Sequence, residues 1–228
     1  MVKSMDDAVG NVVTALKETG QLDNTLIIFT SDNGGLTQRN GKHDNFTENL
    51  PLRRGKGSAF EGGTRVPTIV YWPGKIKAGT TCDEPIMGID FYPTLLELTG
   101  IEGSAEQNQL IEGVSIKALL EDPDATIDRD LYWHFPHYHA GGDSPYSSIK
   151  AKDWRLVEFF EDGGSIELYN LKDDISESFD LSATNPEIVQ DLHQRLKQWR
   201  KDVGAQMMTE NSNFDPERQG ETAKRKKR

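Results

Sequence analysis

The feature that most constrains the fold of this chain is an unbroken apolar and β-branched run at residues 25–30. Apolar and polar residues do not alternate in it, which is typical of a strand covered on both faces in a parallel α/β sheet. The run ends at the polar, glycine-rich residues 31–35. Because open α/β sheets bind ligands at the carboxyl ends of their strands, residues 31–35 are candidates for a functional site.

Neighbouring segments predict further elements of an α/β region. Apolar residues recur at helical spacing over residues 4–19, with Ser4 as the N-cap. A second apolar run at residues 66–72 predicts another strand. Asp90 is expected to cap a short helix, Phe91–Thr99.

The pattern changes from about residue 129. Short aromatic and aliphatic runs, separated by glycine and aspartate turns, predict a small antiparallel sheet. These runs lie at residues 131–135, 154–160 and 165–171. Beyond them, Asn185 is the predicted N-cap and Pro186 the first residue of a helix over residues 186–203.

We therefore divide the chain into three regions. Residues 1–128 are assigned to the α/β domain, 129–204 to a small antiparallel subdomain with a terminal helix, and 205–228 to a flexible tail. The formal net charge of -11 argues against a nucleic-acid surface. Apolar runs are too short for a membrane span, and the first residues do not form a secretory signal. The single cysteine, Cys82, excludes an internal disulfide framework and a cysteine-rich zinc site.

Two groups of residues are candidates for binding a metal ion or an anion. Asp32 and Asn33 place a carboxylate and an amide carbonyl side by side, and such hard oxygen ligands bind Ca²⁺ or Mg²⁺. An ordinary turn is the alternative, because Asn and Gly tolerate positive φ. Lys56 lies between two glycines in the long glycine-rich stretch 36–65, where an ammonium can approach an anion closely. A solvated loop lysine is the alternative there.

Four ordered blocks together closely resemble the carboxyl-terminal half of the type I sulfatases. They are LIIFTSDNGG at residues 26–35, LRRGKG at 52–57, FEGGTRVP at 60–67 and YWPG at 71–74. Residues 89–96 and 167–171 also look like that family. The resemblance implies an α/β, alkaline-phosphatase-like fold. The chain would supply the second half of the large α/β domain and a small antiparallel-sheet subdomain with a C-terminal helix.

The resemblance also implies a reaction and residue roles. The complete protein would hydrolyse sulfate esters of aryl compounds or carbohydrates, with Ca²⁺ and a formylglycine nucleophile. Asp32 and Asn33 would be two of the calcium ligands. Lys56 would be catalytic and substrate-binding, contacting the sulfate group and its bridging oxygen. A dication and an ammonium both stabilise the charge that grows on the leaving oxygen in the transition state.

The family's nucleophile is made from the Cys or Ser of a Cys/Ser-x-Pro/Ala-x-Arg motif. Cys82 does not fit this motif, because Glu84 and Ile86 stand where Pro or Ala and Arg are required, and no serine fits it either. We expect a carboxyl-terminal fragment that is inactive alone. A non-catalytic α/β fragment or binding module is the alternative function. A phosphatase or phosphodiesterase of the same fold is less favoured, because such relatives present more histidine and aspartate for two metals.

His134, His137 and His139 lie close together in the sequence and admit three interpretations. They are a zinc site, an aromatic-rich loop packed on the main domain, or, by resemblance, contacts of His134 and His137 with a sulfated small molecule or carbohydrate. Glu61 and Arg65 are interpreted as a buried pair that shapes the loop, and not as catalytic residues.

Overall fold

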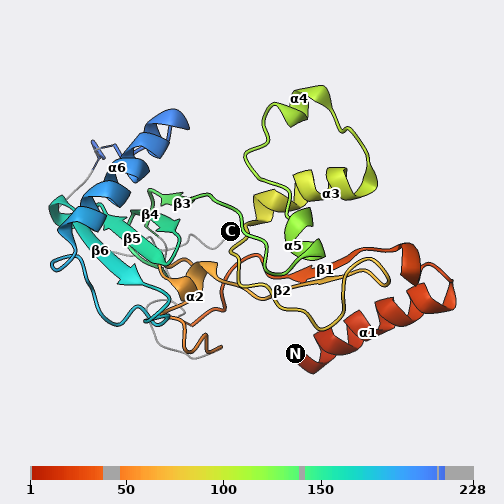
Figure 1. Ribbon diagram of the computed structural model, residues 1–228. Coiled ribbons are helices and arrows are strands. Elements are labelled where there is room, and N and C mark those ends of the chain that lie inside the picture. The colour runs from red at the N-terminus through yellow and green to blue at the C-terminus, as the bar shows by residue number, and fades with distance from the viewer. Residues whose placement is uncertain (1, 38–46, 139–141, 210, 214–228) are drawn as a thin grey trace.

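The computed structural model describes residues 2–37, 47–138, 142–209 and 211–213. Its elements form two groups (Figure 1). One holds a two-stranded sheet with helices α1, α3, α4 and α5, and the other holds a four-stranded sheet with helix α6. His139 and the basic residues 224–228 lie outside the described residues.

The two-stranded sheet contains the apolar run. Strand β1 (Ile27–Thr30) pairs antiparallel with β2 (Thr68–Tyr71), with Ile28 opposite Val70. The expectation of a parallel strand covered on both faces is therefore wrong for the described part of the chain. The β1 side chains are half-buried or exposed. The apolar run indicated a strand, but a side-chain pattern reports the faces of a strand and not the direction of the partner on its edge.

Helices α1 (Val2–Glu18) and α3 (Phe91–Thr99) belong to the same group. Helix α1 begins before Ser4, so Ser4 does not cap it, and none of its residues is buried. Helix α3 has the predicted bounds and closes at Gly100, whose φ of 68° is left-handed. The shorter helices of this group are η1 (Leu22–Asn24), η2 (Gly88–Asp90), α4 (Ala105–Asn108) and α5 (Lys117–Glu121). Among the described residues, no helix has the length and apolarity that a membrane crossing requires.

Asp90 does not cap α3 with its side chain, contrary to expectation. Its buried carboxylate accepts hydrogen bonds from the backbone N–H groups of Met87 (2.7 Å) and Val114 (3.1 Å). The same carboxylate forms an ion pair with Arg129. Asp90 therefore links segments from both groups of elements, because Arg129 directly precedes the four-stranded sheet.

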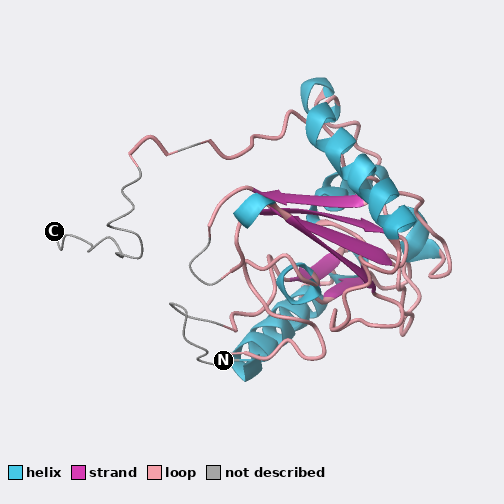
Figure 2. Cartoon of the chain, turned by 90° about the vertical axis from the view of Figure 1, so that its left-hand side faces the viewer, coloured by secondary structure: helices cyan, strands magenta, loops and turns pink. Residues whose placement is uncertain are grey.

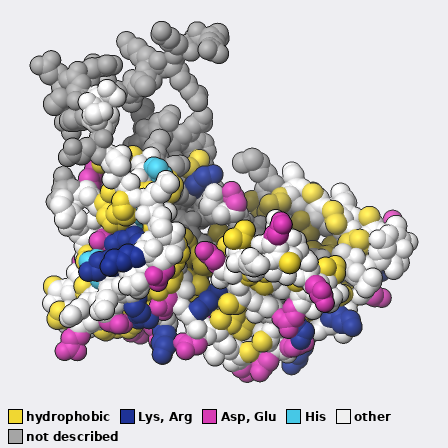
Figure 3. Space-filling view, turned by 90° about the horizontal axis from the view of Figure 1, so that it is seen from above, with side chains coloured by type: hydrophobic (Ala, Val, Ile, Leu, Met, Phe, Trp, Pro, Cys, Tyr) yellow, Lys and Arg dark blue, Asp and Glu magenta, His cyan; other side chains and the backbone are white. Residues whose placement is uncertain are grey.

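Several apolar side chains of the α3 region are exposed. Tyr92 and Leu95 are exposed by 40% each, and Leu110 by 79%. Apolar side chains are visible among the polar ones across the face shown in Figure 3. This group of elements therefore buries its apolar surface only in part.

The four-stranded sheet is antiparallel, and its strands follow one another in chain order, which confirms the predicted small sheet. The strands are β3 (Leu131–Phe135), β4 (Tyr146–Ala151), β5 (Trp154–Phe159) and β6 (Ser165–Asn170), and η3 (Glu161–Gly163) joins the last two. Strand β4 was not predicted, because its sequence YSSIKA holds no apolar run. Its Ser147 and Ser148 are nevertheless completely buried.

Helix α6 (Pro186–Asp202) lies across one face of this sheet, as Figure 2 shows, and ends one residue before its predicted end. The core between helix and sheet consists of Ile149, Ala151, Leu156, Leu168, Leu192 and Leu196. Asn185 does not cap the helix with its side chain. The side-chain amide of Asn185 donates instead to the backbone carbonyl of Leu181 (3.1 Å), in the turn that precedes the helix.

The opposite face of the sheet packs on residues 58–60. Ala59 shares a buried cluster with Tyr146 and Val157, and Phe60 shares another with Tyr169. Helix α2 (Glu61–Thr64) follows directly in the chain. The sheet therefore fixes the position of the segment that carries Lys56.

Candidate functional site

The segments that carry Asp32 and Lys56 are in direct backbone contact. The N–H of Lys56 donates to the carbonyl of Gly35 (3.0 Å), and the N–H of Gly34 donates to the carbonyl of Gly63 (3.0 Å). The end of β1, the segment around Lys56 and helix α2 therefore meet at one place.

Glycine permits this close approach. A Cβ on Gly34 would lie 1.7 Å from the carbonyl oxygen of Gly62, and a Cβ on Gly55 would lie 2.2 Å from that of Gly35. Neither gap can hold a carbon atom unless the backbone moves. The glycines thus let the end of β1 contact residues 53–57, which we call the Lys56 loop.

Asp32 and Asn33 present a carboxylate and an amide carbonyl in consecutive positions. Asp32 is exposed and Asn33 is half-buried. The Asn33 amide nitrogen donates to the carbonyl of Gly34 (2.9 Å). Within the described ranges, neither the Asp32 carboxylate nor the Asn33 side-chain carbonyl has a hydrogen-bond partner, so both could face a cation. No group of three His, Cys, Asp or Glu residues suited to a metal ion is found among these residues.

Lys56 projects from a loop with an unusual backbone. Its side chain is exposed and has no partner in the part of the chain that the structure describes. Arg54, two residues earlier, has a φ of 60°, a left-handed conformation that is rare outside glycine. The carbonyl of Arg54 accepts a hydrogen bond from the side-chain amide of Asn49 (2.9 Å), which helps to hold this conformation.

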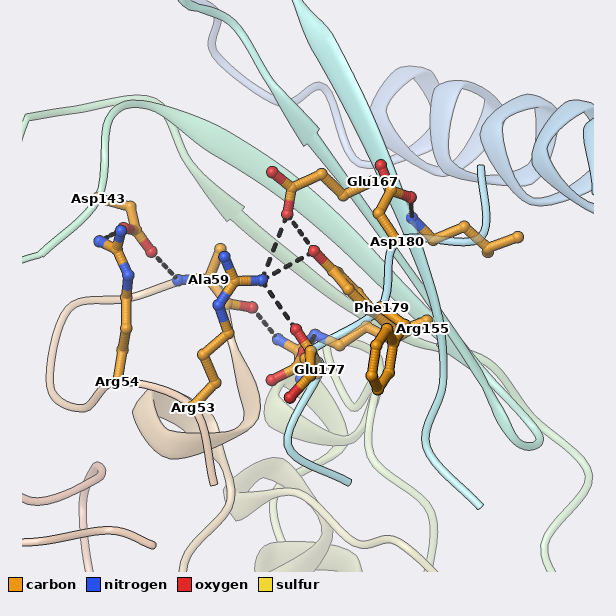
Figure 4. A network of polar contacts seen from close by, with 12 residues as sticks. Arg53, Arg54, Ala59, Asp143, Arg155, Glu167, Glu177, Phe179 and Asp180 are labelled. Atoms are coloured by element: carbon orange, nitrogen blue, oxygen red, sulfur yellow. Dashed lines mark hydrogen bonds and ion pairs between the residues drawn. The ribbon is translucent and has the colours of Figure 1, made fainter. Parts of the chain in front are cut away.

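Asp143 holds Arg54 and Gly57 of the Lys56 loop and Ala59 just after it (Figure 4). Its buried carboxylate accepts a hydrogen bond from the backbone N–H of Ala59 (2.8 Å) and forms an ion pair with Arg54. Its own N–H donates to the carbonyl of Gly57 (3.2 Å). Sequence analysis missed Asp143 because it lies 84 residues from Ala59, and no local pattern reports such a contact.

Glu61 and Arg65 form the predicted ion pair, with 3.3 Å between Nη1 and Oε2. Glu61 is buried, but the Arg65 side chain is 49% exposed, so the expectation of a buried pair is wrong for Arg65. The buried cation is Arg155 of β5, whose Nη1 lies 2.5 Å from Oε1 of Glu61. One signal could have revealed Arg155: it stands two residues before Val157, on the strand face where an apolar residue is expected.

The ring of His134 is held by two polar partners. Its Nδ1 lies 2.7 Å from the hydroxyl of Ser147, and its Nε2 lies 2.8 Å from the carbonyl of Gln206. His137 is exposed and contacts the ring of Phe135 edge-on. Both partners of His134 lie outside the α/β domain, so these contacts do not show the predicted packing on that domain. Substrate contacts of His134 and His137 stay a prediction.

Two cavities lie near these elements. One of about 350 Å³ is lined by Arg53, Arg54 and Phe60, beside the Lys56 loop. A larger one of about 1500 Å³ is lined by Asp32 and Lys150 among others, but not by Lys56. Burial lowers the pKa of Lys150. The larger cavity therefore reaches the proposed metal ligand without containing the lysine.

Comparison with known proteins identifies the family. Residues 1–101 match the family described as Sulfatase, and residues 55–202 match N-sulphoglucosamine sulphohydrolase, C-terminal. A sulfatase of Formosa agariphila is 35% identical over 219 residues, which cover 87% of this chain and 38% of that protein. The N-acetylglucosamine-6-O-sulfatase of Bacteroides thetaiotaomicron is 29% identical over 209 residues, which cover 87% of this chain and 35% of that protein. The chain thus spans less than two fifths of these relatives.

Solved structures agree with this assignment. The crystal structure of Ps i-CgsB in complex with k-i-k-neocarrahexaose has a TM-score of 0.71 at 34% identity, covering 87% of this chain and 41% of that one. The structure of BT4656 in complex with its substrate D-glucosamine-2-N,6-O-disulfate has a TM-score of 0.71 at 30% identity, covering 89% and 39%. Membership suggests the family's typical use of a metal ion and formylglycine. The chain belongs to the type I sulfatase family and corresponds to the carboxyl-terminal portion of its alkaline-phosphatase-like α/β fold.

Proposed function

We propose that this chain supplies the sulfate-contacting lysine and two metal ligands of a site that hydrolyses sulfate esters of carbohydrates. One observation carries the proposal: the Lys56 loop and the end of β1 are joined by the Lys56 N–H···Gly35 hydrogen bond of 3.0 Å. The backbone segments that carry Lys56, Asp32 and Asn33 are thereby adjacent, which supports the proposal that their side chains serve one site.

The chemistry of a sulfate ester suits these groups. Three sulfate oxygens and the bridging oxygen carry negative charge, and the charge on the bridging oxygen grows as the S–O bond breaks. Lys56 would stabilise that oxygen, and Asp32 and Asn33 would hold part of the coordination shell of Ca²⁺, which takes about 6–8 oxygens. Formylglycine supplies the nucleophile in this family. The printed sequence contains no motif for it, so the proposal assigns binding and charge stabilisation to this chain.

Related proteins support a sulfated carbohydrate as the substrate. One similar structure contains a neocarrahexaose and another contains a glucosamine disulfate. Sugar hydroxyls and sulfates need polar partners, and Arg54 of the Lys56 loop, whose side chain is half-exposed although it pairs with Asp143, offers such a partner.

Binding of glucosamine 6-sulfate by this chain in the presence of Ca²⁺ tests the proposal. We expect NMR shift changes at residues 31–35 and 53–57, at least tenfold weaker binding in Lys56→Met, and unchanged binding in the control Lys77→Met, another exposed lysine. Equal binding by wild type and Lys56→Met would overturn the assignment. Tighter binding of glucosamine 6-phosphate would favour the phosphatase alternative.

A binding module without turnover is the second candidate, favoured by the absence of the nucleophile motif from the printed sequence. The two candidates share the binding experiment and differ in hydrolysis. Sequencing of the DNA upstream of codon 1 separates them: a Cys/Ser-x-Pro/Ala-x-Arg motif in frame favours hydrolysis by the complete protein, and its absence favours the binding module.

A further inference from the structure

The described chain buries a group of charged side chains that the proposed sulfate chemistry does not use. Arg155 of β5, Glu61 of α2 and Glu177, which follows β6, are exposed by 0%, 3% and 1%. They converge between the four-stranded sheet and the start of α2, as Figure 4 shows for Arg155 and Glu177. We call these three residues the buried charge cluster.

This cluster holds the start of α2 from two sides. Arg155 contacts the carboxylate of Glu61 (2.5 Å), the carbonyl of Ala59 and the hydroxyl of Thr64 (3.2 Å). Glu177 accepts a hydrogen bond from the backbone N–H of Glu61 through Oε2 (2.7 Å). Side chains from the sheet and from the segment after it therefore fix the first residue of α2.

The start of α2 is in turn connected to the Lys56 loop. The N–H of Gly62 donates to the carbonyl of Arg53 (3.0 Å), and the side chain of Arg53 donates to the backbone carbonyl of Glu177 (3.1 Å). A movement of Glu177 would therefore be transmitted to the loop through both Glu61 and Arg53.

The cluster is not fully satisfied. Oε1 of Glu177 and Nε of Arg155 face each other at 3.7 Å, and neither atom has a hydrogen-bond partner among the described residues. Two buried carboxylates share one fully buried guanidinium, so an ionised Glu177 carries an oxygen that no donor solvates.

The other charged groups that act on Glu177 are Glu61 and, from the Lys56 loop, Arg53, whose guanidinium donates to the Glu177 carbonyl. Arg65 contacts Glu61, and Tyr169 and Glu167 of β6 contact the Arg53 guanidinium. Burial raises the pKa of Glu177 to about 7, although Arg155 and Arg53 act in the opposite direction.

We propose that Glu177 is a positioning residue for the Lys56 loop, and that it holds the loop more firmly when it is protonated than when it is ionised. The loop would then be most ordered in weak acid and would open more often as the pH rises. The relevance of this pH dependence to sulfate-ester binding rests on the proposed function, but the coupling between Glu177 and the loop does not.

Hydrogen exchange of the full chain between pH 5.5 and 8.5 tests this coupling. After correction for the intrinsic exchange rate, the opening of peptides that cover residues 53–64 should increase with pH, by about thirtyfold at most for a group shifted from 4.5 to about 7. Glu177→Gln should abolish this increase and keep the loop as protected as in acid. The control Glu102→Gln, at an exposed glutamate, should behave as wild type.

Protection of residues 53–64 that stays constant or increases with pH in the wild type would overturn the proposal. The same holds for a Glu177→Gln variant that keeps the wild-type pH profile. If Glu177→Gln does not fold, the wild-type profile decides alone. No sulfate ester is present in this experiment, so its failure is distinguishable from failure of the binding test for Lys56.

Discussion

Replacement of Arg155 by methionine removes the buried guanidinium and keeps most of the length of the side chain. Arg155 is completely buried, and its partners include the carboxylates of Glu61 and Glu177. The variant leaves both carboxylates without their shared cation. Breaking a buried ion pair by deleting one partner costs about 3–5 kcal/mol, so we expect Arg155→Met to lower the free energy of unfolding by about that amount at pH 8.

Urea unfolding followed by circular dichroism measures this loss. The matched control is Arg195→Met, because Arg195 also pairs with two carboxylates, those of Asp130 and Asp191, but its side chain is 40% exposed. Exposed pairs contribute about 0–1 kcal/mol, so this variant should lose little stability. Losses that differ by less than about 1 kcal/mol would refute the reasoning.

The pH dependence of that loss gives a second check. Without the guanidinium, the buried carboxylate of Glu177 is neutralised by a proton more readily. The difference between wild type and Arg155→Met should therefore shrink as the pH falls from 8 toward 5. A difference that is the same at both pH values would show that Arg155 stabilises the fold through packing and not through its charge.

Further predictions concern the glycine contact, the cofactor, turnover and pH. Gly34→Ala should separate β1 from α2 and lower the free energy of unfolding by more than about 2 kcal/mol, measured by urea unfolding, because the new Cβ meets the Gly62 carbonyl oxygen at 1.7 Å. Calcium should bind weakly, because Asp32 and Asn33 are two ligands where Ca²⁺ takes about 6–8; a calorimetric Kd below micromolar that is lost in Asp32→Ala would contradict this. The purified chain should not hydrolyse an aryl sulfate, because its sequence has no formylglycine motif, and hydrolysis abolished by Lys56→Ala would disprove this. The unfolding free energy of wild type relative to Glu177→Gln should fall as the pH rises from about 4.5 through about 7, by about 3 kcal/mol at most, because the folded state holds the proton more tightly.

Local patterns predicted most of the second group of elements and helix α3 of the first group. The bounds of α3 and β3 match their prediction, and α6 differs at one end by one residue, since spacing, proline and glycine act within a few residues of each other. Strand β4 was missed because Ser147 and Ser148 are buried by pairing with neighbours on both sides and not by their own apolarity. The pairing of β1 with β2 could not be predicted from local patterns either, because Thr30 of β1 pairs with Thr68, which lies 38 residues further along the chain.

The residues of the candidate site likewise include some that the sequence predicted and some that it did not. The segments of Asp32, Asn33 and Lys56 were found through sequence blocks that resemble a family, and the structure places these segments in contact. The residues that hold the loop, Asp143 and Arg155, were missed, because an isolated charge in a sequence does not reveal a partner about 90 residues away. Such residues are identified only by their burial and their partners in the folded chain.

The chain order of the four-stranded sheet has a kinetic consequence. Each strand from β3 to β6 pairs with the next one along the chain, so the loops closed during pairing are short and their entropic cost is small. The contact between Arg155 and Glu61 closes a loop of 94 residues, and it needs β5 to be in place already. We therefore expect the sheet and α6 to form early during folding and the Lys56 loop to dock last, with the loop also the first part to detach when the chain unfolds.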